Sequence, residues 1–150
     1  MYTVEEYDKE KTKVLKYVLY KKRTIREIKT KFKSQIDENM LEDIIVELKE
    51  NNYISDENYV ERAVSEFIAL KNLSIKEIKY KLMSKGISNN MIEDYIERNR
   101  DELNEYEQKS ADNIALKKCV SMEEYEIIQY LIKKGYTEEH IRTAIEKLEE

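Results

Sequence analysis

The chain has 150 residues, of which 41% are apolar and 39% are charged, and its net charge is −5. It contains two glycines, one cysteine, one histidine, and neither proline nor tryptophan. This length suits one domain or one array of small units. The shortage of turn-forming residues argues against β-sandwiches and tight-turn barrels, and the abundance of Glu, Lys, Ile and Leu favours helices.

Several kinds of catalytic and cofactor site have no counterpart in the sequence. One histidine, His140, and one cysteine, Cys119, are too few for a Cys/His zinc site. Neither common glycine-rich nucleotide-binding motif occurs. We identify no combination of side chains suited to nucleophilic or metal catalysis. The sequence therefore predicts a protein that is not an enzyme and that uses no cofactor or metal.

The sequence also predicts a cytoplasmic protein. The longest apolar runs, such as Phe67 to Leu70, are much shorter than the ~20 residues that cross a membrane. Residues 1–8 are polar and acidic, unlike a secretory signal peptide. A single cysteine cannot form an internal disulfide, which fits a reducing compartment.

An internal repeat with a period of about fifty residues organises the chain. The segment TIREIKTKF at residues 24–32 returns as SIKEIKYKL at residues 74–82. Each segment begins with a hydroxyl residue three positions before Glu, which is the capping-box spacing of a helix start. Each places apolar residues at i, i+3 and i+7, which line one face of a helix.

Another helix is predicted after each of these segments. The apolar positions 36, 41 and 45 recur at 87, 92 and 96 and again at 136, 141 and 145. An N-cap residue follows the first apolar position each time: Asp37, Ser88 and Thr137. Gly86 and Gly135 stand where the preceding helix would end in a left-handed residue, whereas the first unit has Gln35 there and a shorter turn.

A leading helix completes each unit, at about residues 12–22, 56–71 and 102–118. The predicted fold is all-α, with about nine helices in three tandem three-helix-bundle repeats that form an elongated, curved array. The predicted repeats are residues 1–52, with a short polar N-terminal lead, then 53–100 and 101–150. Ile54 and Tyr59 lie at the first junction, and we expect them to be shared between two bundles. We expect a monomer.

Positive charge is concentrated in the first unit. Residues 9–33 carry eleven basic and two acidic side chains, a local charge of +9, whereas residues 34–150 carry −11. This asymmetry suits an acidic partner, although a solvated lysine-rich helical surface would give the same pattern.

Basic side chains on the second helices of the first two units are candidate partner-binding residues. Arg26, Lys29 and Lys33 fall at i, i+3 and i+7, opposite the apolar stripe, and Lys76 and Lys79 take the first two equivalent positions. The full candidate set is Lys22, Arg23, Arg26, Lys29, Lys31, Lys33, Lys76, Lys79, Lys81 and Lys85. Regularly repeated cations suit a nucleic-acid backbone or an acidic protein polymer.

The tyrosines and the histidine give weaker signals. Most of the twelve tyrosines fall at core spacing, and Tyr20 and Tyr80 are the more exposed candidates for stacking on nucleic-acid bases. We expect His140 to be a half-buried packing residue and Cys119 to be a free thiol.

Three motifs, found in four segments of the chain, resemble the RecX family of modulators of the RecA recombinase. The segment YISDENYV at residues 53–60 is similar to the family's G-Y-[LI]-[DNS]-D-x-x-[FY]-A signature, with Asn52 where the family prefers glycine. Residues 14–32 are similar to its A-L-x-x-L…S-x-x-E-L-x-x-K-L pattern. Residues 84–87 and 133–136 resemble its K-G-[FVI] turns. The resemblance extends from about residue 11 to residue 148.

The resemblance implies tandem three-helix repeats that bind the RecA–DNA filament along its helical groove. It further implies inhibition of strand exchange, ATP hydrolysis and coprotease action in DNA repair and the SOS response. Two other hypotheses stay open. The chain could be a helical DNA-binding module that contacts single- or double-stranded DNA through its basic N-terminal unit, or a helical scaffold that recruits another protein.

Overall fold

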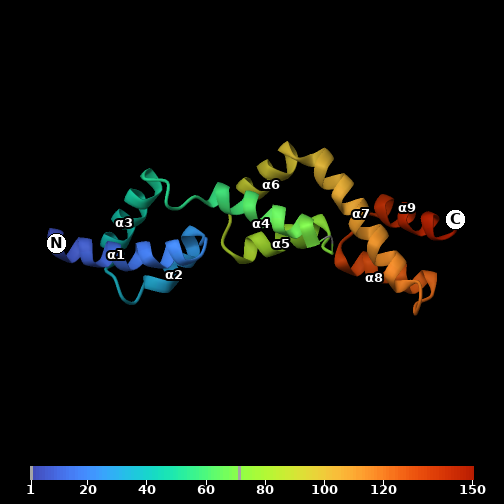
Figure 1. Ribbon diagram of the computed structural model, residues 1–150, viewed down its shortest axis with the longest axis horizontal. Coiled ribbons are helices and arrows are strands. Elements are labelled where there is room, and N and C mark those ends of the chain that lie inside the picture. Colours follow the sequence, from blue (N-terminus) through green and yellow to red (C-terminus); the bar gives the residue numbers. More distant parts are fainter. Residues whose placement is uncertain (1, 71) are drawn as a thin grey trace.

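The computed structural model describes residues 2–70 and 72–150, and these residues form nine α-helices and no strand (Figure 1). The helices are α1 (Val4–Tyr20), α2 (Ile25–Phe32), α3 (Glu38–Glu50), α4 (Asp56–Leu70), α5 (Ile75–Ser84), α6 (Asn89–Arg98), α7 (Arg100–Lys118), α8 (Glu124–Lys134) and α9 (Glu138–Leu148). They follow one another along an elongated molecule whose termini lie at opposite ends (Figure 1). The predicted all-α repeat array is confirmed.

No helix in the described part of the chain is both long enough and apolar enough to span a bilayer.

The helix starts depend on side chains that cap the first turn. The hydroxyls of Thr24 and Ser74 each accept a hydrogen bond, 3.1 Å long, from the backbone N–H three residues later. Glu27 and Glu77 accept in return from the N–H of the capping residue, at 3.0 Å. Two backbone donors that would otherwise be unpaired are thus satisfied at each start, as the sequence predicts.

The first helix begins earlier than the sequence analysis predicts. It starts at Val4 and not near residue 12, because Thr3 and Glu6 form a capping box of their own. The side chains of Tyr2 and Tyr7 reach α3, where both hydroxyls donate to oxygens of Asp43. The polar N-terminal segment is therefore helical and attached to α3. The predicted end of the second leading helix, Lys71, lies outside the described residues.

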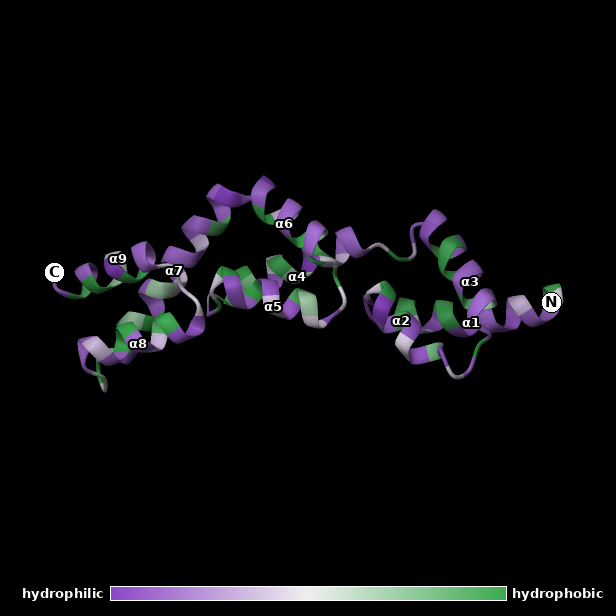
Figure 2. Cartoon of the chain, turned by 180° about the vertical axis from the view of Figure 1, so that it is seen from behind, coloured by the Kyte–Doolittle hydropathy of each residue, from purple (hydrophilic) through white to green (hydrophobic). Residues whose placement is uncertain are grey.

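Buried side chains form three separate hydrophobic cores. Core 1 comes from α1, α2 and α3, core 2 from α4, α5, α6 and the start of α7, and core 3 from the rest of α7 with α8 and α9. In Figure 2, hydrophobic and hydrophilic residues alternate along the helices, as amphipathic helices require. Ile54 belongs to core 1 and the half-buried Tyr59 packs against core 2, so the two residues flank the first junction and contribute to different cores.

One helix belongs to two cores. Leu103 and Tyr106 at the start of α7 are buried in core 2, and Ala111 and Ala115 further along are buried in core 3. Helices α5, α6, α8 and α9 all pack against α7. The second and third units therefore share a helix. The division of the chain at residues 52/53 and 100/101 stays a prediction.

Glycine ends α5 and α8, as predicted. Gly86 has φ of 91° and Gly135 has φ of 94°, the left-handed region that a side chain disfavours. The residue after each glycine donates its N–H to a carbonyl five residues earlier, which completes the C-terminal cap. The first unit has no glycine here, and Ile36 instead donates to Phe32, only four residues back.

Candidate partner-binding surface and the joints between units

The start of the second helix in one unit contacts the glycine turn of the next unit. The Thr24 hydroxyl donates to the carbonyl oxygen of Lys85 at 2.6 Å, and the Ser74 hydroxyl donates to that of Lys134 at 2.7 Å. We call these contacts joint 1 and joint 2. Both hydroxyls are buried, and each also accepts the capping hydrogen bond. A hydroxyl residue is therefore needed at both positions, since it donates and accepts at once.

A carboxylate from the next leading helix completes each joint. Asp56 accepts from the Ile25 N–H at 3.0 Å, and Glu107 accepts from the Ile75 N–H at 2.9 Å. Burial raises the pKa of the Asp56 carboxyl, although the hydrogen bond from Ile25 opposes this. The two joints thus make equivalent contacts. Their carboxylate side chains, Asp56 and Glu107, differ in length by one methylene group.

Two predicted binding residues are also parts of the joints. The methylene groups of Arg26 lie against Gly86, and those of Lys76 lie against Gly135. A Cβ added to Gly135 would lie 2.9 Å from the Cβ of Lys76. A Cβ added to Gly86 would lie only 2.4 Å from the Cβ of Arg26. The stems of Arg26 and Lys76 therefore hold neighbouring units together, while both residues remain exposed overall.

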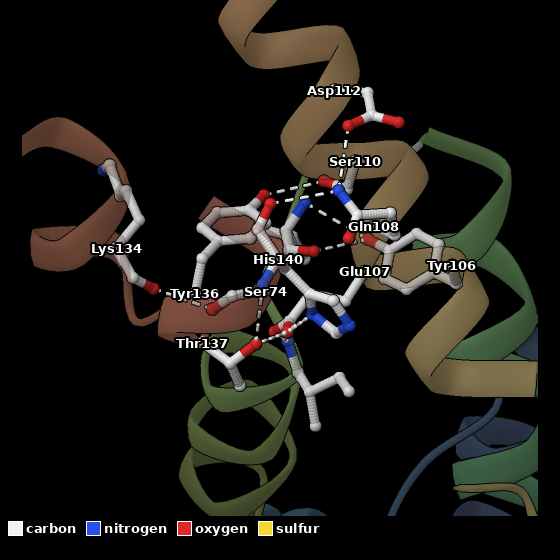
Figure 3. Close-up of polar contacts among 12 residues, drawn as sticks. Ser74, Tyr106, Glu107, Gln108, Ser110, Asp112, Lys134, Tyr136, Thr137 and His140 are labelled. Atoms are coloured by element: carbon white, nitrogen blue, oxygen red, sulfur yellow. Dashed lines mark hydrogen bonds and ion pairs between the residues drawn. The ribbon is translucent and has the colours of Figure 1, made fainter. Parts of the chain in front are cut away.

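Joint 2 contains a polar network that extends beyond the two contacts it shares with joint 1 (Figure 3 shows the network). The Glu107 side chain is only 1% exposed, and besides the Ile75 N–H it accepts from the Thr137 hydroxyl at 3.3 Å and is hydrogen-bonded to Nδ1 of His140. These contacts connect α5, α7 and α9. His140 is half-buried, as expected, but its bond to Glu107 was not predicted. The spacing of Leu103 and Glu107 along one face of α7 could have indicated that Glu107 points inward.

Tyrosine hydroxyls extend this network. The Tyr106 hydroxyl accepts from the Leu73 N–H at 3.1 Å and donates to the Leu73 carbonyl at 2.7 Å. The hydroxyls of Ser110 and Tyr136 are 2.6 Å apart and buried. Burial raises the pKa of both Tyr106 and Tyr136, so both act as neutral hydrogen-bonding groups. The α4–α5 connection is thereby tied to α7.

The structure places two predicted binding lysines in equivalent environments. Lys29 forms an ion pair with Glu42 of α3 at 3.0 Å, and Lys79 forms one with Glu93 of α6, also at 3.0 Å. All four side chains are at least one-third exposed. Exposed pairs of this kind are weak, so a partner can compete for the lysines. Their role in binding stays a prediction.

Four of the predicted basic residues lie around the first joint: Arg23, Arg26, Lys31 and Lys85. Arg26, Lys31 and Lys85 line a shallow hollow of about 460 Å³. Lys85 also lies 3.7 Å from Glu27, and Arg23 and Lys31 lie over the ring of Tyr17 at 4.0 and 5.9 Å from its centroid. The remaining three, Lys22, Lys33 and Lys81, are exposed. The structure thus gathers only part of the predicted set at one place.

Within residues 2–70 and 72–150, no group of three or more His, Cys, Asp or Glu side chains is placed to hold a metal ion.

The fold and these joints define an all-helical tandem-repeat protein with exposed basic side chains on the second helices of its first two units. No family model matches the chain. Regulatory protein RecX of Streptococcus agalactiae is 30% identical over 138 residues, which cover 90% of this chain and 54% of that protein. Regulatory protein RecX of Finegoldia magna is 37% identical over 84 residues, or 55% of this chain and 41% of that protein. The chain spans about half the length of these curated relatives.

Solved structures agree with the sequence matches. The crystal structure of RecX from Lactobacillus salivarius is similar with a TM-score of 0.85 and 27% identity, over 98% of this chain and 99% of that chain. A second crystal structure, of regulatory protein RecX, shares the fold with a TM-score of 0.79 over 92% of this chain and 72% of that chain. The chain belongs to the RecX family.

Proposed function

We propose that the protein is a monomeric cytoplasmic regulator that binds the RecA–DNA filament along its groove. It would mainly inhibit the recombinase, ATPase and coprotease activities of RecA in DNA repair and the SOS response, and would catalyse no reaction itself. The names of the relatives support a regulatory role connected with RecA. The observation that carries the proposal is the equivalent placement of Lys29 and Lys79 in two units held by similar joints.

Regular spacing matters because a filament repeats the same surface at a fixed interval. One exposed cation contributes only about 0.2–1 kcal/mol to a contact. Two cations on units that are joined by specific hydrogen bonds make the second contact effectively intramolecular, which multiplies the affinity. On this proposal the array would need no catalytic centre, because its occupation of the groove would itself alter filament function.

The test is the inhibition of RecA ATPase on single-stranded DNA by charge-reversed variants. Reversing Lys29 and Lys79 together to Glu should weaken inhibition well beyond the effect of either single reversal. Both lysines are exposed at their ion pairs, so the melting temperature should change little. Lys109→Glu is the matched control, since Lys109 of α7 also forms an exposed pair, with Glu105 at 3.1 Å.

Two results would contradict the proposal. The double variant could inhibit RecA as well as the parent protein does, or its inhibition could equal that of the Lys109→Glu control. Either result would mean that these lysines are only solvated and that the partner binds elsewhere on the array.

A further inference from the structure

A groove between the first and second units is lined by aromatic and basic side chains. It has a volume of about 530 Å³ and lies between the end of α1 and the start of α4. Its principal lining residues are Tyr20, Lys21, Lys22, Tyr53, Tyr59 and Arg62. We call it the tyrosine groove. It is distinct from the hollow at joint 1, with which it shares no lining residue.

Two tyrosines are presented to solvent here by the local backbone. Tyr20 is the last residue of α1 and is 86% exposed, because the chain becomes extended at Lys21. Tyr53 is 45% exposed and follows Asn52, whose φ of 64° reverses the chain after α3. The Tyr53 N–H donates to the Leu48 carbonyl at 2.9 Å, which fixes this turn. Neither ring belongs to a core, so both rings are open to a ligand in the groove.

The charge of the groove is positive. Glu66 also lines the groove and partly neutralises Arg62 at 3.6 Å, and both side chains are mostly exposed. In the described part of the chain, neither Lys21 nor Lys22 has an ion-pair partner. Both belong to the segment of residues 9–33, which carries +9. The groove therefore combines uncovered aromatic faces with uncompensated cations.

We propose that the tyrosine groove binds single-stranded nucleic acid, with bases stacked on Tyr20 and Tyr53 and phosphates contacted by Lys21, Lys22 and Arg62. Grooves that bind single strands combine positive charge along the backbone with aromatic side chains on which bases stack. Paired bases in a duplex are already stacked and cannot use these rings. An acidic peptide would satisfy the cations but would leave the tyrosine faces without a partner. The inference goes beyond RecA regulation, since it requires no RecA.

The test is fluorescence anisotropy of the full chain with a labelled oligothymidylate of about 16 nucleotides, a length that suits single-strand-binding sites. Tyr20→Ala and Tyr53→Ala should each weaken binding about fivefold or more, the lower limit for the loss of one stacked base. Tyr20→Phe keeps the ring and should bind like the parent protein. Lys22→Gln should lower the slope of log affinity against log salt by about 0.7, as for one phosphate contact on a single strand.

Tyr125→Ala is the matched control, because Tyr125 on α8 is also exposed, by 68%, but lies in the third unit. It should bind like the parent protein. The inference is overturned if the parent protein does not bind the oligonucleotide, or if the Tyr20 and Tyr53 variants bind as the parent does. It is also overturned if Tyr125→Ala is equally weakened. Displacement of the strand by polyglutamate, with the tyrosine variants unchanged, would assign the groove to acidic proteins instead.

Discussion

At the scale of single residues, the joints depend on polar groups that serve two partners at once. The Thr24 hydroxyl accepts from its own helix and donates to the next unit, and Ser74 does the same. Leaving a buried polar group without its partner costs about 1–3 kcal/mol. Sequence spacing predicted these residues as helix caps, but it could not reveal their second partners, which are about sixty residues away in the chain.

We expect the Asp56 carboxylate to make joint 1 sensitive to pH. Its pKa is raised in the folded protein, mainly by burial, so folding favours the protonated form. Its contribution to stability therefore rises as the pH falls through this raised pKa, and it is least favourable at neutral pH. Asp56→Asn removes the charge while its amide oxygen can still accept from Ile25. We expect the variant to match or exceed the stability of the parent protein at neutral pH.

Urea unfolding of both proteins at neutral pH and at about pH 4, close to the ordinary pKa of Asp, measures this difference. The advantage of Asp56→Asn should shrink on acidification, because the other carboxyl groups titrate alike in both proteins. An advantage that grows on acidification would show that the Asp56 charge stabilises the joint.

At the scale of elements, the periodic features were predictable and the contacts between units were not. Apolar spacing and capping boxes located α2 and α5, and glycine located the ends of α5 and α8, because these signals are local. The start of α1 was missed because the capping box of Thr3 and Glu6 was not recognised.

Asn52, a departure from the family pattern, adopts a left-handed φ that Asn tolerates better than most residues. The placement of the Arg26 and Lys76 stems on glycines could not be predicted, since it depends on how successive units pack.

The two glycine turns should differ in their tolerance of a side chain. Gly86→Ala and Gly135→Ala both place a Cβ at a left-handed residue, which costs roughly 1–2 kcal/mol in each case. The added Cβ overlaps Arg26 at joint 1 more severely than it overlaps Lys76 at joint 2. We therefore expect Gly86→Ala to lower the free energy of unfolding by more than Gly135→Ala does. Chemical denaturation of both variants measures these free energies of unfolding. Equal decreases would mean that the closer overlap with Arg26 is relieved at no cost.

At the scale of the whole molecule, the array is not uniform. The second and third units share α7 and the polar network around Glu107, whereas core 1 shares no helix with core 2 in the described residues. Joint 1 holds the first unit by the contacts of Thr24, Ile25 and Arg26. The first unit is thus connected to the rest mainly through these joint contacts and the chain between α3 and α4 (Figure 1).

This difference predicts two cooperative groups of helices. Leu103→Ala and Ile44→Ala each truncate a fully buried side chain, in core 2 and core 1 respectively, and each should cost about 2–5 kcal/mol. Regions that unfold together lose amide protection together. Leu103→Ala should therefore accelerate hydrogen exchange in α5 and α6 and equally in α8 and α9, because α7 transmits the loss to core 3. Ile44→Ala should accelerate exchange only in α1, α2 and α3. If Leu103→Ala leaves the amides of α8 and α9 protected, the shared helix does not couple the two cores. If Ile44→Ala accelerates exchange in α8 and α9, the whole array unfolds as one unit.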